Sequence, residues 1–233
     1  MPHLILVRHG QSEWNLEKRF TGWVDVGLTG QGKLEACKSG EHIKELKLNI
    51  DFFFSSLQLR AINTLKLIQD TLRDSKTPIK AWQLNERHYG ALTGLNKDEM
   101  KRKLGEDKLH KFRRSWDVKP DPLNRNNPYH PLNIKIYQKI PDTESLKDTY
   151  ERVMEYYKSD IKNKLLTNKN IVISAHGNSI RALCKFLFKL YNNKISLLEI
   201  PTGNPLLISL NSKQEIIECR YLDRDRAKDL LIF

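Results

Sequence analysis

Short apolar runs that do not alternate with polar positions are the clearest pattern along the 233-residue chain. They occupy residues 3–7, 51–54 and 171–175 and consist mainly of Leu, Ile, Val and Phe. A strand that is buried on one face alternates apolar and polar residues, so uninterrupted runs predict strands covered on both faces. Such strands are typical of the inside of a parallel sheet.

A helical pattern of apolar residues follows each of these three runs. Apolar residues recur every three or four positions over 57–72, and helical patterns are also present at 32–48 and 179–191. Each predicted strand is therefore followed by a predicted helix. Further strands are predicted at 79–84, 206–210 and 216–221, the last two joined as a hairpin.

The alternation of strands and helices predicts the α/β fold class, with a mainly parallel central sheet flanked by helices on both faces in a three-layer sandwich. The length suits one such domain, so we expect residues 1–233 to form a single domain. Five prolines interrupt the pattern at 118–141 and predict an irregular surface excursion, which is a candidate cover for a site or a subunit contact. A short tail at 222–233 follows the last strand.

Composition narrows the possible partners. The net charge of +12 favours an anionic partner, whether a small phosphorylated metabolite, a nucleic acid or an acidic surface, although scattered lysines usually form only a solvated face. No apolar run approaches the about 18 residues that span a membrane, and the N-terminus lacks a signal-peptide pattern. We therefore expect a cytoplasmic protein without a membrane partner. Its three cysteines lack CxxC spacing and are expected to be reduced.

Two segments place a histidine and a glycine directly after a predicted buried strand. They are His9-Gly10 and His176-Gly177. Ligands of parallel sheets bind beyond the carboxyl ends of the strands, so we expect both imidazoles in one crevice. A lone histidine is more often structural, but two matched copies favour a site. No HExxH sequence or carboxylate cluster accompanies them, so no metal is expected.

Two arginines are expected beside these histidines. Arg8 precedes His9, and Arg60 lies near the start of the helix that follows the second strand. Guanidinium groups bind phosphate oxygens in a bidentate fork, and a helix N-terminus adds N–H donors. The sequence therefore predicts a phosphate pocket, although Arg60 by itself would more often form a surface ion pair.

Eight stretches spread over nearly the whole chain carry a resemblance to a known family. The chain resembles the histidine phosphatase superfamily and, more closely, the cofactor-dependent phosphoglycerate mutases, which are driven by 2,3-bisphosphoglycerate. RHG alone indicates only the superfamily, whereas NERHYG, the paired arginines and IPTG are typical of the mutases. The stretches are LVRHGQSEWN (6–15), FTGWVDVGL (20–28), LRAINT (59–64), LNERHYGALTGLN (84–96), FRRSWDV (112–118), ESLKDT (144–149), SAHGNSIRA (174–182) and IPTGNPL (200–206).

The resemblance implies roles for five residues. His9 matches the nucleophile that becomes phosphohistidine, which requires a neutral imidazole fixed by a hydrogen bond at its other nitrogen. Glu86 matches the general acid and base. His176, with Arg8 and Arg60, matches the groups that stabilise charge on the transferring phosphoryl oxygens. Without the resemblance, Glu86 would be interpreted as a surface ion pair with the next residue, Arg87.

The resemblance also implies the rest of the site and its ligands. The partners would be small phosphorylated three-carbon acids, with 2,3-bisphosphoglycerate as the phosphoryl donor that primes His9 and with no metal. A homo-oligomer, either a dimer or a tetramer, is expected from the resemblance alone. The residues matched to substrate binding are Ser12, Asn15, Thr21, Gly22, Tyr89, Lys97, Arg113, Arg114, Gly177 and Asn178.

Three positions depart from the usual family pattern, and rival functions remain open. Gln11 stands where glutamate is common, Gln83 where arginine is usual, and Phe112 where tryptophan is usual. The closest alternatives to a mutase are a bisphosphoglycerate synthase and phosphatase, or a broader phosphomonoesterase. A non-catalytic nucleic-acid-binding protein is a remote alternative, because no zinc-finger or RRM-like pattern is present.

Overall fold

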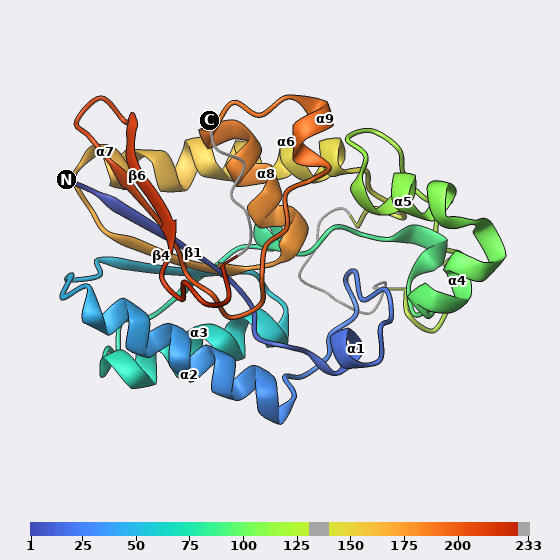
Figure 1. Cartoon of the computed structure of the whole chain (residues 1–233), viewed down its shortest axis with the longest axis horizontal. Coiled ribbons are helices and arrows are strands. Elements are labelled where there is room, and N and C mark those ends of the chain that lie inside the picture. The colour runs from blue at the N-terminus through green and yellow to red at the C-terminus, as the bar shows by residue number, and fades with distance from the viewer. Residues whose placement is uncertain (131–139, 228–233) are drawn as a thin grey trace.

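The computed structural model describes residues 1–130 and 140–227 (Figure 1). Its sheet has the strand order β3-β2-β4-β1-β5-β6. The first four strands in this order run parallel, and β5 and β6 are antiparallel to their neighbours. A mainly parallel sheet between helices is confirmed. The strands are β1 (His3–Arg8), β2 (Phe52–Ser55), β3 (Ile79–Lys80), β4 (Ile171–Ala175), β5 (Leu206–Leu210) and β6 (Ile216–Tyr221).

Helices cover both faces of the sheet. On one face, α2 (Gly30–Glu45) and α3 (Leu59–Leu72) pack against each other, and on the other α6 (Leu146–Tyr156) packs against α8 (Gly177–Leu187) (Figure 1). Side chains alternate between the two layers: Ile5 and Val7 of β1 enter the α2/α3 layer, while Leu4 and Leu6 enter the α6/α8 layer. Both faces are apolar, which explains why the strand sequence does not alternate.

Most of the remaining elements lie around and beyond the carboxyl ends of the strands, whereas the helix at Lys162–Leu166 leads into the amino end of β4. The helices α4 and α5 form the far end of the molecule, opposite the N-terminus (Figure 1). Neither was predicted, because these helices are highly charged and bury mainly Met100 and Leu109. The elements are α1 (Glu13–Leu16), two 3₁₀ turns (Trp82–Leu84 and Gly90–Leu92), α4 (Lys97–Leu104), α5 (Glu106–Arg114), a π-helical turn (Tyr157–Ile161), α7 (Lys162–Leu166) and α9 (Asn192–Ile195).

The predicted strand at 79–84 is wrong over most of its length. Only Ile79–Lys80 pair with β2, and the chain then turns through the 3₁₀ helix Trp82–Leu84. The backbone N–H of Leu84 donates to the carbonyl of Ala81, not to a neighbouring strand. This turn directs residues 85–89 toward the ends of β1 and β4 instead of extending the sheet edge.

The other boundaries differ by a few residues. The helix predicted at 32–48 begins at Gly30, where the Thr29 hydroxyl accepts the N–H of Gly32, and ends at Glu45. The helix predicted at 179–191 spans Gly177–Leu187 instead.

Residues 118–130 form an irregular segment, as expected for the excursion. The backbone N–H of Leu123 donates to the carbonyl of Asp142, which ties the two sides of the segment together. Residues 131–139 of the excursion and 228–233 of the tail lie outside the described residues. Within the described chain, no helix is both long and apolar enough to cross a membrane. That residues 1–233 form one domain stays a prediction.

Candidate active site

The site begins where two neighbouring strands end. Arg8 of β1 pairs with Ala175 of β4 in parallel register, so the next residue on each strand is a histidine. The rings of His9 and His176 have their centroids 5.0 Å apart, tilted by 59°. The structure thus brings the two imidazoles side by side at the carboxyl ends of β1 and β4.

His9 is held as a neutral imidazole with one nitrogen available. Its Nδ1 lies 2.7 Å from the carbonyl oxygen of Gly10, and since a carbonyl only accepts, Nδ1 carries the hydrogen and Nε2 the lone pair. Burial, followed by the charges of Arg60 and Arg8, lowers the pKa of His9 well below its ordinary value. The ring is therefore unprotonated at neutral pH, with the lone pair of Nε2 available.

His176 is more enclosed and is bound at the other nitrogen. Its Nε2 lies 2.8 Å from the Ser56 hydroxyl, and its backbone N–H donates to the Ser179 hydroxyl at the start of α8. Burial, with the charges of Arg60 and then His9, lowers the pKa of His176 as well. His176 is fully buried, and its ring lies behind that of His9 without lining either of the two pockets described below.

Arg60 and Arg8 bring positive charge to the two histidines. Arg60, which is buried in the first turn of α3, donates to the carbonyls of Gly22 at 2.9 Å and Val24 at 2.8 Å. Burial lowers the pKa of Arg60 to about 10, so it remains charged at neutral pH. Arg8 donates from Nη1 to the carbonyl of Ile200 at 2.8 Å. Hydrogen bonds to backbone carbonyl oxygens hold both guanidinium groups in place and leave their positive charge intact.

Glu86 presents one bound and one available oxygen. Its Oε1 accepts the backbone N–H of Arg87 at 2.8 Å and of Asn178 at 3.1 Å, together with the Asn178 amide at 2.9 Å. A Cβ atom on Gly177 would lie 3.7 Å from Oε2, so Oε2 is beside the start of α8. This arrangement leaves Oε2 as the oxygen that can exchange a proton with a ligand.

A second layer fixes the backbone behind Glu86. Arg152 forms a buried ion pair with Glu144 and donates to the carbonyls of Gln83, Asn85 and Glu86. Gln83 therefore enters this layer through its main chain. The alternative interpretation of Glu86 fails in the described structure, because the guanidinium of Arg87 donates to the carbonyls of Phe112 and Arg113, not to Glu86.

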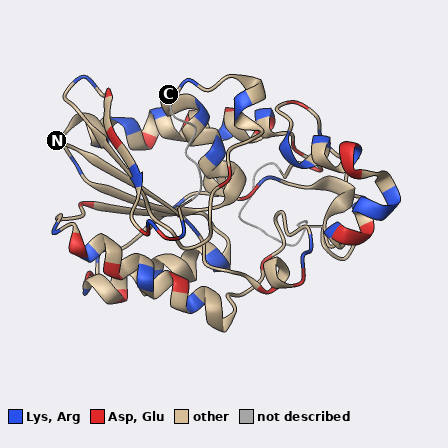
Figure 2. Cartoon of the chain, viewed as in Figure 1, with Lys and Arg blue, Asp and Glu red and all other residues tan. Residues whose placement is uncertain are grey.

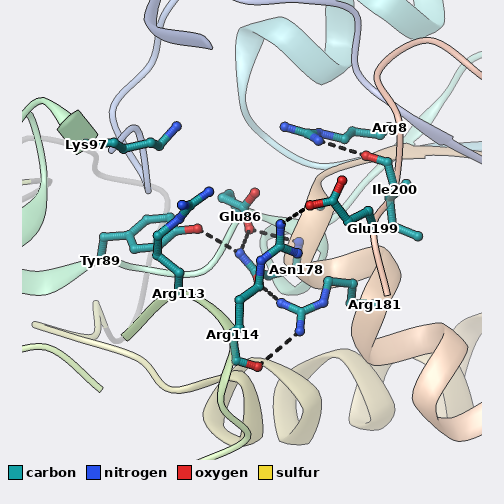
Figure 3. Close-up of a pocket in the computed structure, with 11 residues that line it drawn as sticks. Arg8, Glu86, Tyr89, Lys97, Arg113, Arg114, Asn178, Arg181, Glu199 and Ile200 are labelled. Carbon is teal, nitrogen blue, oxygen red and sulfur yellow. Dashed lines mark hydrogen bonds and ion pairs between the residues drawn. The ribbon is translucent and has the colours of Figure 1, made fainter. Parts of the chain in front are cut away.

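Two adjoining pockets open on this constellation. A larger one of about 270 Å³ and a smaller one of about 50 Å³ share Arg8, Glu86, Tyr89 and Lys97. His9 lines the smaller pocket. Around the larger one, cationic side chains outnumber carboxylates, and Figure 3 shows Lys97 of α4, Arg113 and Arg114 of α5, Arg181 of α8 and Arg8 of β1 around it. A ligand with two anionic groups fits this pair of pockets.

The predicted substrate-binding residues divide between the pockets, with one exception. Tyr89, Lys97, Arg113, Arg114, Gly177 and Asn178 line the larger pocket, and Asn15, Thr21 and Gly22 line the smaller. Ser12 lines neither in the described structure. It is fully buried and caps α1 by accepting the backbone N–H of Asn15.

Five lining residues were absent from the sequence prediction. Arg181, Glu199 and Ile200 line the larger pocket, and Arg19 and Phe20 line the smaller. Arg181 is three positions after Asn178 on α8, a spacing that places two side chains on one helix face and that could have identified it. Glu199 pairs with Arg114 across 85 residues of sequence, which no local pattern reveals.

The donor set suits phosphate. Within residues 1–130 and 140–227, no group of three or more His, Cys, Asp or Glu side chains is placed to hold a metal ion. The Nε of Arg8 is buried without a hydrogen-bond partner among the described residues, as expected for a donor that faces an anionic ligand. Elsewhere, Lys and Arg are dispersed over the helices (Figure 2).

Comparison with known proteins supports the same class. A model of the histidine phosphatase superfamily (branch 1) matches residues 4–221. Among solved structures, a mycobacterial glucosyl-3-phosphoglycerate phosphatase superposes with a TM-score of 0.70 at 22% identity, covering 95% of this chain and 97% of that chain. A variant of the phosphoserine phosphatase from Entamoeba histolytica gives 0.68 at 20% identity, with 96% and 98% coverage. At these identities the structures show the fold alone.

Sequence relatives are much more similar. The chain is 79% identical over 238 aligned positions to the 2,3-bisphosphoglycerate-dependent phosphoglycerate mutase of Pelagibacter ubique, with 100% of each chain covered. It is 47% identical to the protein of that name from Caulobacter vibrioides, with 99% and 98% covered. The chain therefore belongs to the histidine phosphatase superfamily and, within it, to the family of 2,3-bisphosphoglycerate-dependent phosphoglycerate mutases.

Proposed function

We propose that this protein interconverts 3-phosphoglycerate and 2-phosphoglycerate, a step of glycolysis and gluconeogenesis, through a phosphohistidine at His9. The proposal is supported by the family and by one observation above all. His9 keeps a neutral imidazole with Nε2 unprotonated, because burial and the neighbouring charges of Arg60 and Arg8 disfavour its protonation. This is the state that an attacking nitrogen needs in a pocket built for phosphate.

Each transfer exchanges one bond to phosphorus for another. The lone pair of His9 Nε2 forms the N–P bond while the P–O bond to the leaving oxygen breaks, and Glu86 gives that oxygen its proton. In the reverse direction Glu86 takes the proton from the attacking hydroxyl. Arg8, Arg60 and His176 stabilise the negative charge on the phosphoryl oxygens during both steps.

The two pockets suit a phosphorylated three-carbon acid. One anionic end would occupy the smaller pocket beside His9, with Asn15 and the Gly177 backbone as further donors. Lys97, Arg113 and Arg114 would bind the carboxylate and the second phosphate position in the larger pocket. Turning the acid around within this cationic space brings its other oxygen to His9.

Priming and assembly follow from the family. 2,3-Bisphosphoglycerate would supply the phosphoryl group that first loads His9, held by the same cationic residues, and no metal is required by these groups. A cytoplasmic location stays a prediction from the sequence, and a dimeric or tetrameric state stays a prediction from the resemblance.

The test is a mutase assay with 3-phosphoglycerate on purified protein. We expect 2-phosphoglycerate to form, the rate to rise with catalytic 2,3-bisphosphoglycerate, and turnover to survive a chelator and vanish in His9→Ala. Inorganic phosphate formed faster than 2-phosphoglycerate would instead assign a phosphatase, the nearest alternative on this scaffold. No turnover together with salt-sensitive binding to unrelated DNA would overturn both.

A further inference from the structure

The buried guanidinium of Arg181 has no assigned task in the reaction. Arg181 lies on α8 with 3% of its surface exposed, and burial lowers its pKa to about 9. Within the described chain it forms no ion pair; it donates instead to the carbonyls of Ile195 at 2.6 Å and Arg114 at 3.2 Å, and from Nη1 to the amide oxygen of Asn178 at 2.9 Å. A buried cation without a carboxylate partner is costly to keep, so a task at the site is expected.

The bond to Asn178 determines which way that amide points. A guanidinium only donates, so it binds the oxygen of the amide and turns the nitrogen in the opposite direction. Asn178 Nδ2 then donates to Glu86 Oε1 at 2.9 Å and to the Tyr89 hydroxyl at 3.0 Å, as Figure 3 shows. Rotating the amide by half a turn would place its oxygen against the Glu86 carboxylate, which repels it. The amide nitrogen would then face the guanidinium of Arg181, and two donors would oppose each other.

The orientation of Asn178 in turn determines which oxygen of Glu86 is free. The Asn178 amide is the side-chain donor among the three N–H groups on Oε1, and the other two come from the backbone. With all three in place, Oε1 has little capacity left for a further proton donor, and Oε2 faces the start of α8 near Arg8. The side-chain bond adds to the two backbone bonds that restrain rotation of the carboxylate.

We infer that Arg181 is a positioning residue for Glu86, which acts through Asn178 and reserves Oε2 for proton exchange with the substrate. The inference rests on the proposed role of Glu86 in phosphoryl transfer. Arg181 need not contact the substrate for this role, although it lies in the wall of the larger pocket. Its loss should therefore reduce the rate of transfer more than it weakens binding.

The test is a double-mutant cycle on the full-length enzyme, with Arg181→Met, Asn178→Ala and the double variant. We expect Arg181→Met to lower kcat by about 10–100-fold while KM changes by less than about 3-fold. Because Arg181 acts through Asn178, adding Arg181→Met to Asn178→Ala should cause little further loss of kcat. Arg181→Lys, which retains a donor without the planar fork, should recover part of the rate and serves if Arg181→Met fails to fold.

The matched control is Lys185→Met, one turn further along α8. Lys185 donates to the carbonyl of Leu190 and lies over Trp116, away from both active-site pockets, so kcat should be unchanged. A raised KM with unchanged kcat in Arg181→Met, or additive losses in the cycle, would overturn the inference. If the wild-type enzyme proves to be a phosphatase, the same cycle run on phosphate release separates this inference from the assigned reaction.

Discussion

The β1 corner, His9-Gly10, and the β4 corner, His176-Gly177, have the same sequence directly after a buried strand. Their three-dimensional surroundings differ. At the β1 corner, His9 binds its neighbour's carbonyl through Nδ1 and lines the smaller pocket. At the β4 corner, His176 is bound through Nε2 to Ser56 and starts the helix α8. The same residue pair thus leaves Nε2 of His9 available at one strand end and binds Nε2 of His176 at the other, as the proposed roles of nucleophile and supporting group require.

The glycines differ in the same way. A Cβ atom on Gly10 would lie 2.1 Å from the backbone oxygen of Gly32, so the β1 corner packs directly on the first turn of α2. For a Cβ on Gly177, the nearest atoms would belong to the side chains of Arg8 and Glu86, both at 3.7 Å, an ordinary van der Waals distance. Gly10 therefore serves packing, and Gly177 leaves room in the pocket. The comparison shows that contacts, and not the motif, decide what each corner does.

The largest expected difference between the corners is in activity. His9→Gln should lower kcat/KM by about 10⁴-fold or more, because no group remains to carry the phosphoryl, whereas His176→Gln should lose about 10²–10³-fold in charge stabilisation. Labelling with radioactive 2,3-bisphosphoglycerate distinguishes them: His9→Gln should take up no acid-labile phosphate, and His176→Gln should take it up slowly. Equal labelling of the two variants would show that the assignment of roles is wrong.

Alanine at the two glycines should separate stability from activity. Gly10→Ala forces a methyl group into backbone and should lower the free energy of unfolding by about 2–3 kcal/mol. Gly177→Ala should change it by less than about 1 kcal/mol but lower kcat/KM by about 10-fold, because its methyl group enters the space between Arg8 and Glu86. Urea unfolding and steady-state kinetics measure both, and the reverse order would contradict the comparison.

The smallest effect concerns a property that the corners share. Both imidazoles have a lowered pKa in the folded protein, so below about pH 6.5 the unfolded chain binds protons that the folded chain does not. The free energy of unfolding should be independent of these histidines above that pH. Below it, the free energy of unfolding should fall by up to about 1.4 kcal/mol per pH unit for each histidine. Urea midpoints from pH 8 to pH 5 test this, and His9→Gln should have a shallower slope. An unchanged slope would show that His9 does not contribute.

The sequence predicted the centre of the fold better than its periphery. Leu4 to Val7 and Ile171 to Ile173 are apolar on both faces because both faces are covered, and that pattern is local. Trp82 to Leu84 continue the apolar character of the preceding strand, yet backbone hydrogen bonds turn them into a 3₁₀ helix. The charged helices α4 and α5 have too few apolar residues for a stripe to be evident.

The site could be predicted where a strand end or a family motif identified it. His9, His176, Arg8 and Arg60 follow from strand ends and a helix start, and the structure brings them together. The contacts behind them could not be predicted: the pairing of Arg152 with Glu144 and the bonds of Arg181 depend on how helices pack after folding. Ser12 was predicted from a family motif to bind substrate. In the structure it caps α1 and lines neither of the two pockets.

The order of the strands in the sheet has a consequence for protein synthesis. Leu4 in β1 pairs with Ile171 on one side and with Ile208 on the other. At about 5–20 residues per second, a ribosome takes on the order of 10–40 s to supply both neighbours after making β1. Until β4 is made, the apolar side chains of β1 have no neighbouring strand of the final sheet and are available to chaperones or to other nascent chains. His9 is thus among the first residues made, yet its surroundings are completed only when the last strands emerge.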